Sequence, residues 1–110
     1  MTNATSRRDA HSARVILRRI RGRDAAFGAR IDAVVTDMTK ALGDVLQRLP
    51  PEPTQDLVDE LGRVVTTLRT ADSALDGGNE AGTLQLLELA QARLARFVAS
   101  VEAQAQPDRR

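Results

Sequence analysis

The sequence predicts an all-α fold, namely an antiparallel three-helix bundle with an additional short N-terminal amphipathic basic helix. Three observations lead to this prediction. Apolar residues recur at spacings of three and four along three long segments, which is the period of one helix face. Clusters of proline and glycine separate these segments from one another. Patterns typical of β-strands are lacking.

The short basic helix is predicted near the N-terminus. Residues 1–11 are mostly polar and are expected to form a flexible tail, and Ser12 is a suitable N-cap for a helix that ends at about residue 21. Arg14, Arg18 and Arg21 share one face of this helix. The opposite face is apolar, with residues at positions i, i+3, i+4 and i+7: Ala13, Ile16, Leu17 and Ile20.

The first long helix is predicted over residues 25–49, after a break at Gly22 and a cap at Asp24. Its apolar stripe is broad, as in helices of globular bundles. The stripe consists of Phe27, Ile31, Val34, Val35, Met38, Leu42, Val45, Leu46 and Leu49. The sequence Pro50-Pro51-Glu52-Pro53 ends the helix, because proline cannot continue the backbone hydrogen-bond ladder.

Two further helices follow, and local signals delimit both. Thr54 is expected to cap the third helix, Gly77-Gly78 to close it, and Asn79 to cap a fourth helix over residues 80–104. Their stripes contain Leu57, Leu61, Val64, Leu68, Ala71 and Leu75 in the third helix, and Leu84, Leu87, Ala90, Leu94, Phe97, Val98 and Val101 in the fourth. The short turns between the three long helices make them antiparallel neighbours.

The predicted organisation has three parts. Residues 1–23 form a basic arm, residues 24–105 form the helical bundle, and residues 106–110 form a disordered tail. A chain of 110 residues has the usual size of one domain. Roughly two-thirds of the surface of such a chain can be buried on folding, so the bundle needs no disulfide or metal to be stable.

Charge is distributed very unevenly along the chain. Residues 1–23 carry a net charge of +6 and the remaining 87 residues a net charge of −5, although the whole chain is close to neutral. The positive charge of the arm comes from seven arginines: Arg7, Arg8, Arg14, Arg18, Arg19, Arg21 and Arg23. Because arginine binds carboxylates and phosphates in a bidentate manner, the arm is predicted to contact an anionic partner.

The sequence favours a noncatalytic protein–protein interaction or regulatory module whose arm contacts that partner. The alternative is a small nucleic-acid-associated protein that binds the phosphate backbone through the arm. Stacking on bases is excluded, since the chain has two phenylalanines and no tryptophan or tyrosine. In a third interpretation the apolar face of the arm docks on the protein's own bundle and its arginines are merely solvated.

Self-association is also predicted. Three helices leave their apolar stripes incompletely covered, and Leu86 and Leu89 lie outside the main stripe of the fourth helix. Such residues form an interface or widen the buried face. We therefore expect a homodimer, with candidate interface residues Ile16, Leu17, Ile20, Leu86 and Leu89.

Other functional classes are not supported. Enzymatic activity, cofactors, a bound metal and a small-molecule substrate are not expected, because the chain has no cysteine, a single histidine (His11) and no phosphate-binding glycine motif. No apolar segment is long enough to span a membrane, and the arm's apolar face is too small for stable membrane anchoring. Fifteen arginines against one lysine suggest a GC-rich bacterial genome, and we expect a cytoplasmic protein.

Overall fold

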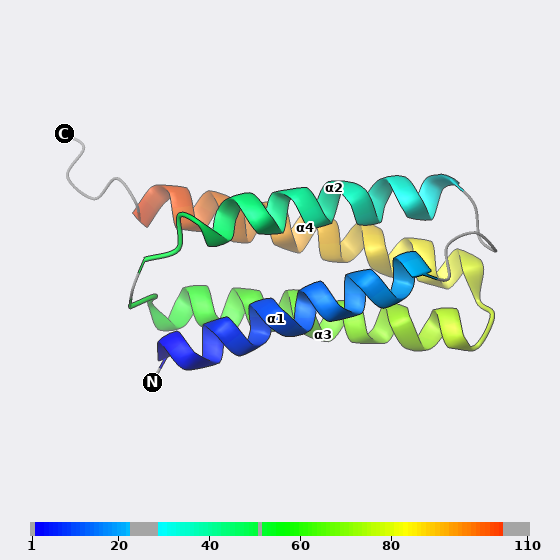
Figure 1. Ribbon diagram of the computed structural model, residues 1–110, viewed down its shortest axis with the longest axis horizontal. Helices are drawn as coiled ribbons and strands as arrows, with labels where there is room; N and C mark the ends of the chain where they lie inside the picture. Colours follow the sequence, from blue (N-terminus) through cyan, green and yellow to red (C-terminus); the bar gives the residue numbers. More distant parts are fainter. Residues whose placement is uncertain (1, 23–28, 51, 105–110) are drawn as a thin grey trace.

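The computed structural model describes residues 2–22, 29–50 and 52–104, with side chains from residue 7 in the first range and from residue 30 in the second. Within these ranges the regular elements are four α-helices. They are α1 (Thr2–Gly22), α2 (Ala29–Leu46), α3 (Gln55–Asp76) and α4 (Glu80–Gln104) (Figure 1). The all-helical prediction is confirmed.

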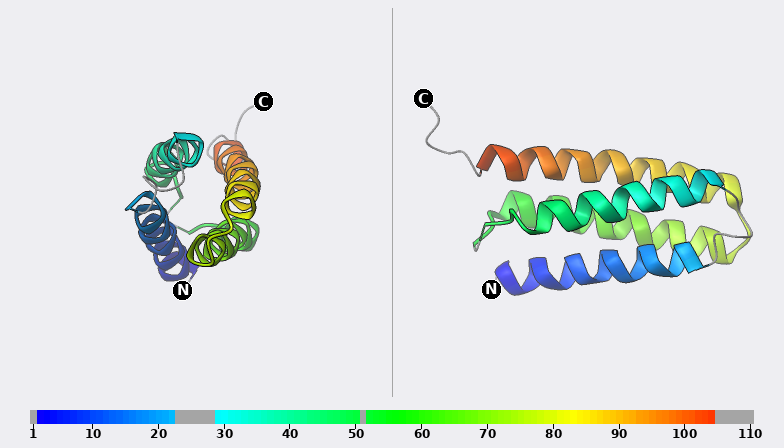
Figure 2. Two further views of the ribbon diagram at one scale, coloured as in Figure 1. Left: turned by 90° about the vertical axis from the view of Figure 1, so that its right-hand side faces the viewer. Right: turned by 45° about the horizontal axis from the view of Figure 1, so that its top comes forward.

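The four helices lie lengthwise beside one another and surround a common core. Figure 1 shows the chain running in one direction along α1 and α3 and in the other along α2 and α4. In the end-on view of Figure 2, each helix occupies one corner. Contacts join α3 to α4, α1 to α3, α2 to α4 and α1 to α2, so that α1 and α4 are diagonal, as are α2 and α3.

Helix α1 differs most from the prediction. It begins at Thr2 instead of Ser12 and, with 21 residues, is longer than α2 with 18 and nearly as long as α3 with 22. Its apolar residues belong to the same buried cluster as those of the other helices: Ala10, Ala13, Ile16, Leu17 and Ile20. The expected flexible tail is therefore helical over residues 2–11. Ala10 extends the predicted stripe toward the N-terminus, and packing against α3 supports a segment whose own helical pattern is weak.

The order of neighbours also differs from the prediction. The sequence predicts that the second and third helices are adjacent, whereas α2 and α3 lie across the core from each other. The long helix α1 lies between them and covers the apolar stripes that three helices would leave exposed. The chain passes from α2 to α3 at one end of the bundle, after α2 ends at Leu46. A helix cannot continue past this point, because the ring of Pro50 would clash with the carbonyl group four residues earlier.

The predicted caps of α3 and α4 are confirmed. The Thr54 hydroxyl accepts a hydrogen bond from the backbone N–H of Leu57 at 3.3 Å. Gly78 has a positive φ of 77°, which is the conformation that glycine favours at the end of a helix. The side-chain oxygen of Asn79 then accepts a hydrogen bond from the backbone N–H of Gly82 at 2.9 Å. These local contacts fix the tight turn that places α3 against α4.

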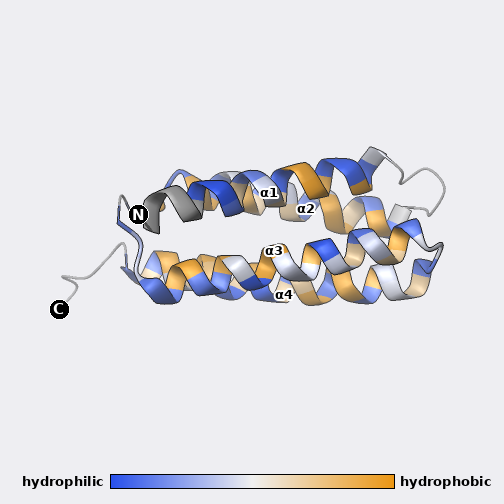
Figure 3. Cartoon of the chain, turned by 90° about the horizontal axis from the view of Figure 1, so that it is seen from below, coloured by the Kyte–Doolittle hydropathy of each residue, from blue (hydrophilic) through white to orange (hydrophobic). Residues whose placement is uncertain are grey.

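The core is aliphatic, with Phe97 as its largest side chain. The apolar residues of α3 are almost completely buried, and Thr83 of α4, also buried, donates its hydroxyl hydrogen to the Asn79 carbonyl at 2.7 Å. Figure 3 shows that hydrophilic and hydrophobic residues alternate in bands along each helix. None of the helices in the described part of the chain combines the length and the hydropathy needed to cross a membrane. The apolar bands face the shared core, and the polar bands are left for the surface.

Candidate anion-binding surface

The buried face of α1 determines where its arginines lie. Ala13, Leu17 and Ile20 have almost no exposed surface, and they orient the helix about its own axis. The side chains that remain on the outer side are mostly cationic. Six arginines of α1 are exposed and face solvent, namely Arg7, Arg8, Arg14, Arg18, Arg19 and Arg21. Arg23 lies outside the described residues.

Four of these arginines form one line, which we call the arginine edge: Arg7, Arg14, Arg18 and Arg21. Their spacings of seven, four and three residues place them along one side of the helix. At 1.5 Å per residue, the edge is about 21 Å long from the first arginine to the last. The edge lies on the side of α1 that faces α2, because the last three arginines line a groove together with Thr39 of α2.

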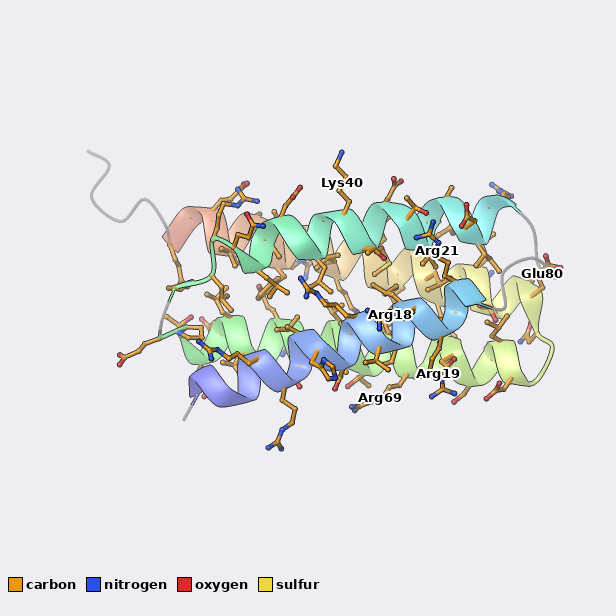
Figure 4. All side chains as sticks on the ribbon, viewed as in Figure 1. Arg18, Arg19, Arg21, Lys40, Arg69 and Glu80 are labelled. Carbon is orange, nitrogen blue, oxygen red and sulfur yellow. The ribbon has the colours of Figure 1, made fainter. Side chains whose placement is uncertain are left out.

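The groove between α1 and α2 has a volume of about 270 Å³. Leu17 lies at its base and is almost fully buried. The Thr39 hydroxyl donates its hydrogen to the Val35 carbonyl at 2.8 Å, so it is not a donor for a ligand. In Figure 4, Arg18 and Arg21 lie near the boundary between α1 and α2, while Lys40 points away from the bundle. The donors available in the groove are therefore guanidinium groups.

The arginine edge has few ionic partners of its own. Arg21 lies 3.8 Å from Asp32 of α2, and both side chains are about half exposed. Such exposed pairs contribute little to stability. The side chains of Arg14 and Arg18 form no ion pair or hydrogen bond with any residue that the structure describes. Their charges are available to a ligand.

On the opposite side of α1, one of the arginines has an ionic partner in a neighbouring helix. Arg8 and Arg19 lie there, and Arg19 is 3.4 Å from Asp72 of α3, whose side chain is only 13% exposed. This contact ties α1 to α3 and partly neutralises that side. The two sides of α1 therefore have unequal capacity to bind an anion.

The neighbouring helices make the basic surface narrow. Between Ala29 and Leu46, α2 carries two bases and three acids, and α3 carries two arginines and five acids. A ligand that reaches past α1 on either side thus approaches negative charge. At physiological ionic strength charges are screened only beyond about 8 Å, so these acids influence a broad ligand. The positive charge of this surface is therefore confined to a narrow strip along α1.

The predicted interface residues lie in three different environments. Ile16, Leu17 and Ile20 are part of the buried core and do not form a surface. Leu86 is half-buried and packs against that core. Leu89 is 44% exposed and is, with Val15, one of two large apolar side chains exposed in the described part of the chain. Of the five candidates, Leu89 is therefore the one that is well exposed for contact with another molecule.

A second pocket was missed at the sequence level. It lies between α3 and α4 and has a volume of about 390 Å³. Its lining consists of Glu60, Arg63, Leu89, Ala92, Arg93 and Arg96. The sequence signals for this pocket are two neighbouring arginines, Arg93 and Arg96, and the position of Leu89 outside the apolar stripe. They are weak signals, because the residues from α3 come close to them only in the folded bundle.

The structure offers no arrangement suited to metal chemistry among its described residues, where no group of three or more His, Cys, Asp or Glu side chains could hold an ion. Comparisons with protein-family models, curated proteins and solved structures give no match. The function therefore has to be inferred from the residues of this chain.

Proposed function

We propose that this protein is a noncatalytic interaction module whose arginine edge binds an acidic segment of a partner protein. The observation that carries the proposal is the position of Arg14 and Arg18. They line the groove between α1 and α2 and lack an ionic partner in the described part of the chain. Charge-assisted hydrogen bonds from these guanidinium groups to carboxylates are among the stronger polar contacts that proteins make.

The rigidity of α1 supports this proposal. The backbone that carries the arginines is anchored by Leu17 and Ile20 in the core, so binding does not have to order it. Only side-chain rotamers are restricted when a ligand binds, which keeps the entropic cost of binding small. An isolated flexible arm would have to order its backbone as well.

The narrowness of the basic surface favours an acidic protein segment over a nucleic-acid duplex. A single acidic helix or extended chain fits along α1, whereas a duplex also covers part of α2 or α3. Those helices carry more acids than bases, and their repulsion weakens the binding of a broad polyanion.

A nucleic acid is the second candidate. The specific observation in its favour is the straight line of four arginines, about 21 Å long, which can follow one phosphate backbone. Contacts of this kind would be independent of base sequence.

The two candidates are separated by the binding of two labelled probes, a polyglutamate peptide and a DNA duplex, each measured by fluorescence anisotropy. We expect the peptide to bind more tightly than the duplex at ~50 mM salt, and its affinity to fall steeply at ~200 mM. Replacing both Arg14 and Arg18 by alanine should weaken peptide binding about tenfold, because two charge-assisted contacts are lost.

The matched control is Arg30→Ala with Arg69→Ala, which removes the same charge from α2 and α3. This variant should weaken binding less than about threefold, by long-range electrostatics alone. Equal losses in the two double variants would show that net charge, and not the groove, attracts the peptide. Tighter binding of the duplex, lost in the Arg14/Arg18 variant, would establish the nucleic-acid candidate.

The homodimer predicted from the sequence is a separate hypothesis, in which a second copy of the chain contacts Leu89. One reason for expecting a homodimer no longer holds, because α1 covers the apolar stripes. Leu89 alone also gives only a small contact surface. Sedimentation at high micromolar concentration tests the dimer. A species of 11.9 kDa, the mass of one chain, would exclude it.

A further inference from the structure

The pocket between α3 and α4 lies across the bundle from the arginine edge. Contacts join α1 to α2 on one side and α3 to α4 on the other, so the two surfaces have no helix in common. Glu60 and Arg63 come from α3, and Leu89, Ala92, Arg93 and Arg96 come from α4. This pocket therefore requires an explanation of its own.

Glu60 provides the first indication of a ligand. One carboxylate oxygen, Oε1, is buried and has no hydrogen-bond partner among the described residues. A buried acceptor without a partner destabilises a protein, and such groups in native structures are normally satisfied. Glu60 also lines the pocket, and a rotation of its half-buried side chain would bring this oxygen within reach of a donor on a bound molecule.

The three arginines provide the second indication. Arg63, Arg93 and Arg96 line the pocket, and none of their guanidinium groups forms an ion pair or a hydrogen bond with another described residue. With Glu60 they give the lining a net charge of +2. A ligand that fills the pocket therefore carries a negative group, which the guanidinium groups can bind in a bidentate manner.

The apolar part of the lining completes the pattern. Leu89 is 44% exposed at the pocket, and the neighbouring exposed Ala92 has only a methyl group. An exposed leucine beside a pocket offers apolar contact to a ligand. The pocket thus presents an apolar surface, an anion-binding group of arginines and one hydrogen-bond acceptor.

We propose that this pocket binds a short peptide segment of a partner protein in which an apolar side chain lies next to a carboxylate. The apolar side chain packs on Leu89 and Ala92. The carboxylate binds to guanidinium groups of Arg63, Arg93 and Arg96, and a backbone N–H of the segment donates a hydrogen bond to Glu60. This site is independent of the arginine edge and does not rest on the function proposed for it, but it excludes a homodimer in which a second copy of the chain covers Leu89.

N-acetyl-L-leucine is a suitable probe, because it carries an isobutyl group, a carboxylate and one amide N–H. We expect millimolar binding, in keeping with so small a ligand, in an NMR titration that follows the methyl signals of Leu89 and Ala92. N-acetyl-L-leucinamide has no carboxylate and should bind roughly tenfold more weakly. Equal shifts from the two probes would overturn the proposal, as would unchanged methyl signals up to about 20 mM probe.

Variants assign the roles within the pocket. Arg96→Ala should weaken N-acetyl-L-leucine binding roughly tenfold, whereas Arg14→Ala with Arg18→Ala should leave it unchanged. The native protein should prefer N-acetyl-L-leucine to 4-methylpentanoate, which lacks the amide, and Glu60→Ala should abolish that preference. Circular dichroism verifies that each variant is folded.

Two results would contradict the site directly. If Arg96→Ala binds the probe as well as the native protein does, the arginines do not hold its carboxylate. If the Leu89 signals change with protein concentration in the absence of probe, a second copy of the chain covers the pocket, and the peptide is not its occupant.

Discussion

At the scale of single residues, the turn between α3 and α4 shows how the capping side chain of Asn79 limits the size of the residue at position 82. The Asn79 side chain caps α4 by accepting a hydrogen bond from the backbone N–H of Gly82. A Cβ atom at position 82 would lie only 2.5 Å from Nδ2 of Asn79, so a larger residue there displaces the cap. Glycine at this position leaves room for the cap, and its φ is not in the positive range that only glycine favours.

This coupling gives a prediction for a double-mutant cycle. Asn79→Ala should destabilise the protein by about 1 kcal/mol through loss of the cap. Gly82→Ala should give little or no gain in the native background, but should stabilise the Asn79→Ala background by up to about 1 kcal/mol, because alanine favours the helix once the clash is gone. Urea unfolding followed by circular dichroism measures both values. Equal effects of Gly82→Ala in the two backgrounds would disprove the coupling.

At the scale of elements, α1 serves two purposes with two faces. Its apolar face completes the core, and its arginine edge remains on the surface. Deleting the helix therefore removes both together, and loss of binding by a truncated protein would be uninformative. Point substitutions on one face or the other separate folding from binding.

We predict opposite behaviour for substitutions on the two faces. Ile20 is fully buried, and Ile20→Ala should cost about 2–5 kcal/mol of unfolding free energy through the cavity that it leaves. Arg18→Ala, on the exposed edge, should change that free energy by less than about 0.5 kcal/mol. Denaturant unfolding checks both variants. A small effect of Ile20→Ala would show that α1 is only loosely attached.

The helices differ in how well their sequence predicts them. Thr54, Gly77-Gly78 and Asn79 act on residues a few positions away, so the bounds of α3 and the start of α4 follow from local signals. The start of α1 does not, since residues 2–11 have little apolar pattern and their helix depends on packing against α3. The sequence predicts seven candidate arginines and places Arg14, Arg18 and Arg21 of the arginine edge on one helix face. The groove beside this edge was not predicted, because Thr39 comes from another helix.

At the scale of the whole molecule, all four helices share one hydrophobic core. The buried residues of α1 belong to the same cluster as Phe97 of α4, although α1 and α4 lie on a diagonal. Which helices are adjacent in such a bundle depends on how the surfaces of whole helices pack against one another. The spacing of apolar residues within one helix does not specify this packing. For this reason the sequence predicted an all-helical fold but did not predict that α2 and α3 would be separated.

A shared core predicts cooperative unfolding. The backbone amides of Leu17 in α1 and Leu94 in α4, both buried, should exchange hydrogen with solvent through the same global opening, with equal free energies. Native-state hydrogen exchange followed by NMR measures both. If Leu17 exchanges with a much lower opening free energy, residues 1–23 behave as a separate arm, as the division predicted from the sequence implies.

If the arginine edge binds an anion as proposed, α1 links ligand binding to the melting temperature of the protein. Because the arginine edge has its present shape only while α1 is packed, an anion that binds there binds the folded state and not the unfolded chain. At a ligand concentration of about 100 times Kd, such binding adds about 2.7 kcal/mol to the free energy of unfolding. In a chain of this size, that gain in free energy corresponds to a rise in the melting temperature of roughly 10 °C. Thermal melting of the unmodified protein can therefore be used to screen anionic partners without labels.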